Sequence, residues 1–152
     1  MKRAIQHTAT AAVLAVGAEL SRRGYDVSFT MGNTAKIDML CAVPNGNPFK
    51  VQVKGVSNRN GLYVQEEFFV GDAQPDLYLV VVYVPKYVPE LDTQGAFEFH
   101  ILSHDQAKHE FEKMSKFKKD GRPYIGGSGL NWSSVSKYKD AWGVFPKHVF
   151  TE

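Results

Sequence analysis

The run from Asp76 to Val84 constrains the fold of this chain more than any other segment does. Every residue after the aspartate is apolar or aromatic, and four of those eight are valine. A continuous apolar stretch of this length, rich in β-branched residues, is typical of a strand that is buried on both faces. The sequence therefore predicts an α/β protein whose sheet has its core at this strand.

The size and composition of the chain are those of one globular domain. The sequence has 152 residues, of which 43% are hydrophobic and 22% are charged, so neither a disordered nor a fibrous protein is expected. The chain contains no internal repeat and no linker long enough to separate two domains. Residues 1–152 are therefore predicted to form a single domain, with a less regular C-terminal extension from about residue 121.

The sequence gives no sign of a membrane or secreted protein. No apolar run approaches the roughly 18 residues that a membrane span requires. The stretch after Lys2 and Arg3 is interrupted by polar residues and lacks the apolar centre of a signal peptide. Cys41, the only cysteine, lies in an apolar run where a buried and unreactive thiol is expected. We expect a cytoplasmic protein without disulfides.

Hydrophobic periodicity and turn residues predict the order of the other elements. A helix is expected over residues 8–23, because good helix formers dominate there and Gly24 follows as a stop signal. The turn Pro44–Pro48 joins the second and third strands as a hairpin. The remaining predictions are strands at Tyr25–Thr30, Ala35–Val43, Phe49–Val56 and Phe97–Ile101, an extended segment at Leu62–Val70, a helix from Ser103 to about Lys116, an irregular stretch from Gly121 to Gly129, and a helical turn within Val135–Trp142 whose Tyr138, Trp142 and Phe145 pack onto the body.

Asp38 is a carboxylate in the middle of an apolar strand. Burying an unpaired charge costs several kcal/mol, so such a residue needs a cationic partner or a metal. Period-two geometry places Asp38 on the less apolar face of its strand, and the same rule puts Lys50, Gln52 and Lys54 on one face of the next strand. A hairpin register exists that brings Asp38 beside Gln52 and Lys54 on a common face.

The chemistry of these three side chains suits a metal-assisted reaction on a phosphate. Carboxylate, amide and backbone oxygens together with waters are the ligands that Mg²⁺ prefers. A lysine beside the metal orients or deprotonates an attacking water, or stabilises charge that develops on a phosphate. Asp38 and Gln52 are therefore the candidate metal ligands, and Lys54 is the candidate catalytic base or charge stabiliser.

The arrangement resembles the PD-(D/E)XK nuclease superfamily. Its members carry an acidic residue followed by (D/E/Q)-x-K on the next strand, which Asp38 and Gln52-Val53-Lys54 match. The segments GAELSRRGYDVSFTMGNTAKIDMLCAV and FKVQVKG are similar to Holliday-junction resolvases and Mrr-type restriction enzymes, so the likeness is strong over roughly the first third of the chain. Gln52 departs from the acidic residue that most members carry, although Mrr-type enzymes use Q-x-K.

The resemblance implies a fold, a reaction and a further ligand. The fold is a restriction endonuclease-like three-layer core, in which helices flank a central mixed β-sheet in the order αβββαβ. The activity is Mg²⁺-dependent hydrolysis of DNA by an endonuclease or resolvase-like enzyme, with Mn²⁺ as a substitute metal. Members of the superfamily often add a glutamate from the first helix, and Glu19 stands in that element. Many such nucleases act as dimers, so a homodimer is expected.

Other interpretations of the same residues remain open. Asp38 could be structural and pair with Lys36 or Lys50, and Glu19 could pair with Arg22 or Arg23 on the helix surface. The loss of one negative ligand at Gln52 also fits a catalytically weak or inactive module that binds nucleic acid or a protein partner. A third alternative is a nuclease of the same superfamily that acts on RNA, because the fold places metal and lysine identically for either polymer.

The histidines and the basic residues are two further groups with a possible function. The five histidines lack zinc-ligand spacing, so no zinc site is expected. The net charge of +2 does not indicate a nucleic-acid partner by itself. One segment is nevertheless basic, and it is interpreted either as a solvated helix face or as a phosphate contact: Lys108, Lys113, Lys116, Lys118, Lys119 and Arg122.

Overall fold

The central strand is the one that the apolar run predicts. In the computed structural model, which describes residues 2–30, 37–91, 95–114, 120–122 and 129–148, β5 (Leu77–Tyr83) is buried at every position except the last. It lies between β3 (Pro48–Val56), to which it is parallel, and β6 (Glu98–Ser103), to which it is antiparallel. The expected burial of this strand on both faces is confirmed.

The N-terminal half forms the predicted helix and three-stranded meander. Helix α1 (Lys2–Arg22) leads to β1 (Asp26–Phe29), β2 (Met39–Ala42) and β3, and the five-stranded sheet has the order β1-β2-β3-β5-β6. The helix begins before the predicted residue 8 but ends where Gly24 predicts. Gly24 has a φ of 87°, and the Tyr25 N–H donates to the Leu20 carbonyl at 3.1 Å, so the glycine closes the last turn in the left-handed conformation.

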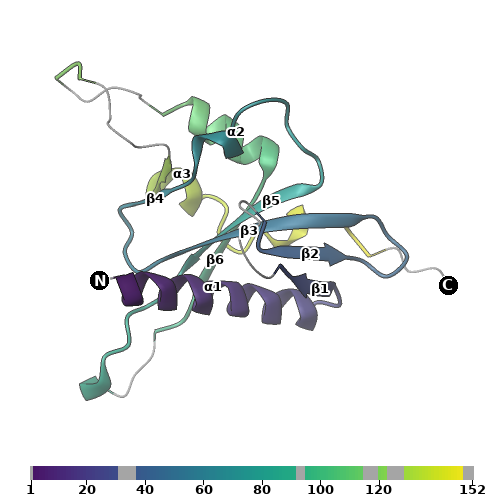
Figure 1. Ribbon diagram of the computed structural model, residues 1–152, viewed down its shortest axis with the longest axis horizontal. Coiled ribbons are helices and arrows are strands. Elements are labelled where there is room, and N and C mark those ends of the chain that lie inside the picture. Colours follow the sequence, from purple (N-terminus) through teal and green to yellow (C-terminus); the bar gives the residue numbers. More distant parts are fainter. Residues whose placement is uncertain (1, 31–36, 92–94, 115–119, 123–128, 149–152) are drawn as a thin grey trace.

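Helices cover both faces of the sheet, as Figure 1 shows. On one face α1 buries Ala12, Val16 and Leu20 against the side chains of β2, β3 and β5. The opposite face carries α2 (His104–Glu112), α3 (Trp132–Ser136) and the two-stranded sheet of β4 (Gly61–Tyr63) and β7 (Gly129–Asn131). The mixed sheet flanked by helices is therefore confirmed.

The connection from β3 to β5 differs from the order αβββαβ. It consists of β4 and the short 3-10 helix η1 (Glu66–Phe68), and α2 follows β6 instead of preceding β5. The extended segment predicted at Leu62–Val70 is also wrong beyond Tyr63. An extended chain would point Phe68 and Phe69 to opposite sides, whereas the turn buries both of them in the apolar layer under α2.

The C-terminal region packs as predicted but its helix begins earlier. Asn131 caps α3 by accepting the Ser134 N–H at 2.9 Å, which starts the helix before Val135. The 3-10 helices η2 (Pro89–Leu91) and η3 (Trp142–Val144) complete the elements, and Phe145 is buried among the aromatic residues of the α1 face. The start of the strand predicted at Ala35, the end of the helix predicted to Lys116 and most of Gly121–Gly129 lie outside the described residues.

No helix within the described ranges has both the length and the apolar character that crossing a membrane requires.

Candidate metal centre

The hairpin of β2 and β3 separates the apolar and polar side chains as predicted. Met39 lies opposite Val51, and both are completely buried under α1. Leu40, one residue further, lies opposite Lys50 and is half exposed on the other face of the sheet. The alternation confirms that even-numbered residues of this hairpin face away from α1.

Asp38 lies at the point where the pairing of these two strands ends. Its backbone N–H donates to the Val51 carbonyl at 2.9 Å, and its Oδ2 accepts the Val53 N–H at 2.6 Å. The Asp38 carboxylate thus binds a β3 N–H beyond the last residue pair of the two strands, and it uses Oδ2 for this bond. Burial raises the pKa of Asp38, and the Val53 hydrogen bond and the Lys54 charge only partly oppose the increase.

Gln52 is the polar side chain of the site that is most deeply buried. It is 6% exposed, and its position in β3 is next to Leu79 of β5. Its Oε1 accepts no hydrogen bond from any described residue. An unpartnered buried oxygen costs about 1–3 kcal/mol, so its retention requires an explanation such as a ligand.

Lys54 completes the group on the same face. It follows Gln52 by two residues, lies beside Val81 of β5 and is half-buried. Its positive charge acts on the Asp38 carboxylate. The strand positions, the Val53 bond to Asp38 and the Lys54 charge thus place the three predicted residues, Asp38, Gln52 and Lys54, around the end of the β2–β3 pairing.

The other candidate residues have different described partners. Glu19 binds Arg22 at 2.8 Å and Arg23 at 3.5 Å, which are the two arginines considered as its structural partners. Lys50 has 3.4 Å contacts with Gln74 Oε1 and Asp76 Oδ2. The role of Glu19 as a metal ligand stays a prediction.

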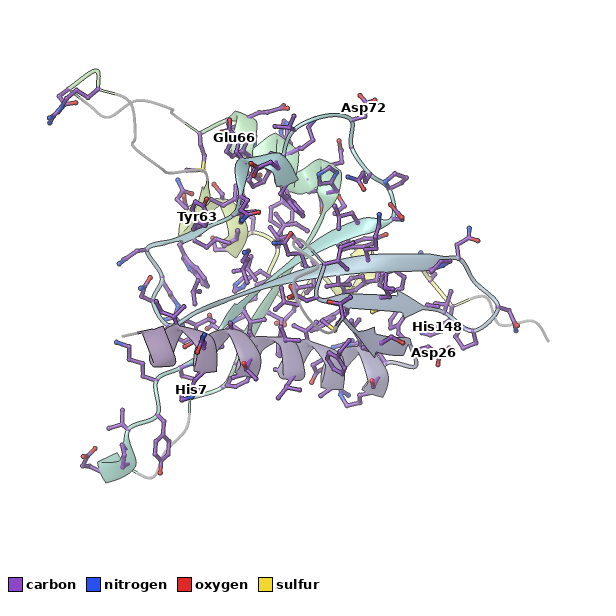
Figure 2. The ribbon with its side chains drawn as sticks, viewed as in Figure 1. His7, Asp26, Tyr63, Glu66, Asp72 and His148 are labelled. Carbon is purple, nitrogen blue, oxygen red and sulfur yellow. The ribbon has the colours of Figure 1, made fainter. Side chains whose placement is uncertain are left out.

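The available donor set fits a hard cation with several waters. In the part of the chain that the structure describes, no three His, Cys, Asp or Glu residues gather where they could hold a metal. Figure 2 shows His7 near the start of α1 and His148 beyond its other end. The site thus offers one carboxylate and one amide oxygen, which suits Mg²⁺ because this ion keeps much of its hydration shell.

Two features that support the candidate site could not be predicted from the sequence. The Val53 N–H that holds Asp38 is a backbone group, and its direction depends on where the pairing with β2 stops. Gly55 follows Lys54, and a Cβ there would lie 2.7 Å from the Thr8 carbonyl oxygen and 2.8 Å from the Ala12 Cβ. The glycine therefore lets α1 pack closely against the strand that carries Gln52 and Lys54.

Cys41 is too deeply buried to act as a nucleophile. Its side chain is 2% exposed in the layer beneath α1, on the face of β2 opposite Leu40. Burial raises the pKa of its thiol to about 12, so the thiolate that a nucleophile needs is almost absent at neutral pH. The prediction of a buried cysteine is confirmed.

Comparisons with known proteins identify no family for this chain. No protein family matches the chain, and no curated protein is similar to it. Among solved structures, the chain is similar to the bacterial homing endonuclease I-Ssp6803I with a TM-score of 0.49 and 18% sequence identity, over 90% of this chain and 87% of that chain. The assignment of the site therefore depends on the residues of this chain.

Proposed function

We propose that this chain is a metal-dependent nuclease that hydrolyses phosphodiester bonds in DNA, as an endonuclease or a resolvase-like enzyme. The observation that carries the proposal is the buried, unpartnered Oε1 of Gln52 on the face that it shares with Asp38 and Lys54. The resemblance of Asp38 and Gln52-Val53-Lys54 to the PD-(D/E)XK motif supports it. The same resemblance suggests Glu19 as an additional ligand.

Each residue of the site has a separate role in the proposed reaction. Asp38 and Gln52 would hold Mg²⁺, which supplies Lewis-acid polarisation of the phosphate when bound. The Val53 N–H fixes one Asp38 oxygen and so orients the other. Lys54 stabilises the negative charge that develops on the phosphate, or takes a proton from the attacking water. Water adds to phosphorus, the sugar oxygen leaves with a proton, and a phosphomonoester and an alcohol result.

Metal-dependent cleavage tests this proposal. Wild type and Asp38→Ala are compared on supercoiled plasmid, branched DNA and single-stranded RNA, with Mg²⁺, with Mn²⁺ and with a chelator. We expect wild type to cut DNA only with metal, and the Asp38→Ala rate to fall by about 10³-fold or more, as for loss of a central catalytic group. Parental cleavage by the folded variant would remove Asp38 from the mechanism, and cleavage of RNA alone would change the substrate class.

A second candidate function is a catalytically weak or inactive module that binds nucleic acid or a protein partner. Gln52 itself favours it, because an amide in place of a second carboxylate lowers the negative charge available to a metal. Folded wild-type protein that binds nucleic acid but does not cut it under any of the metal conditions would identify this function.

A further inference from the structure

A second cluster of charged side chains lies around Glu110, apart from the candidate metal centre. The carboxyl group belongs to α2 and its side chain is only 4% exposed. Its Oε1 accepts hydrogen bonds from Lys137 Nζ at 2.8 Å, Tyr138 Oη at 2.9 Å and Lys113 Nζ at 3.4 Å. Burial alone would raise the pKa of Glu110, but the three donors lower it more, so the group is an anion at neutral pH.

Glu110 holds two cations at one place on the surface. The Lys113 and Lys137 side chains are 50% and 54% exposed, so both ammonium groups keep a side that faces solvent. One carboxylate balances only one of the two positive charges. A surface lysine loses rotamer entropy when it is fixed, and the contacts with Glu110 already restrict both side chains.

A second carboxylate repeats this arrangement nearby. Glu98 binds Arg59 at 3.0 Å and Lys139 at 3.7 Å, and the Arg59 guanidinium lies 4.1 Å from the centre of the Tyr83 ring. Asp140 is exposed next to Lys139 and reduces the positive charge there. Of the two clusters, the one around Glu110 therefore keeps the larger net positive charge, and its cations are Lys113 and Lys137.

The lysine pair lies on the same side of the sheet as the candidate metal centre. Phe111 and Tyr138 pack on the apolar layer that contains Leu79 and Val81. These two β5 residues are the strand neighbours of Gln52 and Lys54. Figure 1 shows α2 and α3 together on the side of the sheet opposite α1. Both places therefore lie on the α2 side of the sheet.

We propose that Lys113 and Lys137, held by Glu110, bind the phosphodiester backbone of duplex DNA away from the bond that is cut. This inference rests on the proposed function, which identifies the bound polymer as DNA. It implies that the protein contacts a stretch of duplex longer than the nucleotides that lie at the candidate metal centre. Phosphate contacts of this kind fix the position of the duplex without reading its sequence.

The test is DNA binding without cleavage. Affinity for a fluorescently labelled duplex is measured with a chelator present, from about 50 to 200 mM salt, because each phosphate contact steepens the salt dependence by about one. The test variant is Lys113→Gln/Lys137→Gln, which removes both charges and leaves amide donors for Glu110. Lys113→Arg/Lys137→Arg keeps the charges.

The charge-matched control is Lys86→Ala/Lys147→Ala. Both lysines are exposed. Lys86 precedes η2, in the segment that extends past α1 away from α2 in Figure 1, and Lys147 adjoins His148, which lies 2.9 Å from the Arg23 carbonyl of the α1 end. The control therefore removes the same charge from the other side of the molecule.

We expect the glutamine variant to bind roughly tenfold or more weakly, with a salt slope smaller by about two. The arginine variant and the control are expected to bind like wild type. Equal affinity of wild type and the glutamine variant, or an equal loss in the control, overturns the inference.

Cleavage separates this inference from the proposed function. At saturating DNA the glutamine variant should cut at the wild-type rate, because the pair lies outside the metal centre. If wild type never cuts and the glutamine variant still loses salt-dependent binding, the nuclease proposal fails and the DNA-binding surface stands. If wild type cuts and all variants bind alike, the surface fails and the nuclease stands.

Discussion

At the scale of single residues, Asp38 combines an energetic cost with the role of metal ligand that we propose for it. Its pKa is raised by burial, so the ionised form that a metal requires is disfavoured in the metal-free protein. A carboxyl group whose folded pKa lies above its unfolded value lowers stability at pH values above the folded pKa, and the loss disappears as the pH falls through that value.

Asp38→Asn should therefore stabilise the metal-free protein at neutral pH while it abolishes metal-dependent cleavage. The amide oxygen can still accept the Val53 N–H, so the fold is preserved. The gain should shrink as the pH is lowered below the Asp38 pKa. Thermal unfolding of both proteins across the acid range, with a chelator present, measures it. A lower melting temperature for the variant at pH 7 would contradict the assigned burial cost.

Two substitutions of Gln52 should change the metal affinity in opposite directions. Gln52→Leu removes the unpartnered buried oxygen, so the metal-free protein should gain about 1 kcal/mol while its metal affinity falls. Gln52→Glu restores the second carboxylate of the motif and should bind Mn²⁺ more tightly than wild type. Denaturant unfolding and metal titration check the two results. Unchanged metal affinity in both variants would exclude Gln52 as a ligand.

Period-two periodicity predicted which residues share the polar face, because strand geometry determines side-chain direction without knowledge of the rest of the fold. It could not predict the bond from the Val53 N–H to Asp38, which depends on where the β2–β3 pairing ends, or the missing partner of Gln52, which depends on which groups surround the buried side chain. Of the two lysines at Glu110, only Lys113 belonged to the basic segment that the sequence showed. Their arrangement depends on Lys137, which belongs to a different part of the chain.

At the scale of elements, the contact between α1 and β3 depends on Gly55. A Cβ at this position would overlap the Thr8 carbonyl and Ala12. Gly55→Ala should therefore cost about 1–3 kcal/mol, as overpacking does, and weaken metal binding by shifting Lys54 and Gln52. Gly143→Ala is the control, because a Cβ there meets no atom within 4 Å. Equal unfolding free energies for the two variants would show that the contact is not tight.

The hydrogen bonds of Glu110 with Lys137 and Tyr138 join α2 to the segment after α3, and they should weaken in acid. Its pKa is lowered from 4.5, so its contribution to stability is present above that value and is lost as the pH falls through the folded pKa. Glu110→Gln should flatten this acid limb of the stability curve. Chemical unfolding at a series of pH values checks it, and an acid limb identical to that of wild type would contradict the assigned role.

Local sequence signals predicted α1, the meander and β5, because each has a strong periodicity or stop signal. They missed β7, whose three residues gain their strand conformation from pairing with β4, where Leu130 lies opposite Leu62. They also misjudged the segment after Tyr63. Adjacent Phe68 and Phe69 favour a turn only because one apolar layer receives both.

At the scale of the whole molecule, the two faces of the sheet carry different kinds of side chain. The face under α1 buries apolar side chains of β2, β3 and β5, and so provides a rigid support. The other face carries Gln52 and Lys54 on β3 and is covered by α2 and α3, whose C-terminal ends carry the lysine pair at Glu110. The expected homodimer and the role of Glu19 stay predictions.

The most direct test of the central claim is Mn²⁺ binding, followed by electron paramagnetic resonance, in wild type, Asp38→Ala and Glu19→Ala. Metal binding is independent of the choice of nucleic acid. We predict that wild type binds Mn²⁺ and that Asp38→Ala loses this binding while remaining folded, and the effect of Glu19→Ala decides whether α1 supplies a ligand. Wild-type affinity in the Asp38→Ala protein would contradict the account.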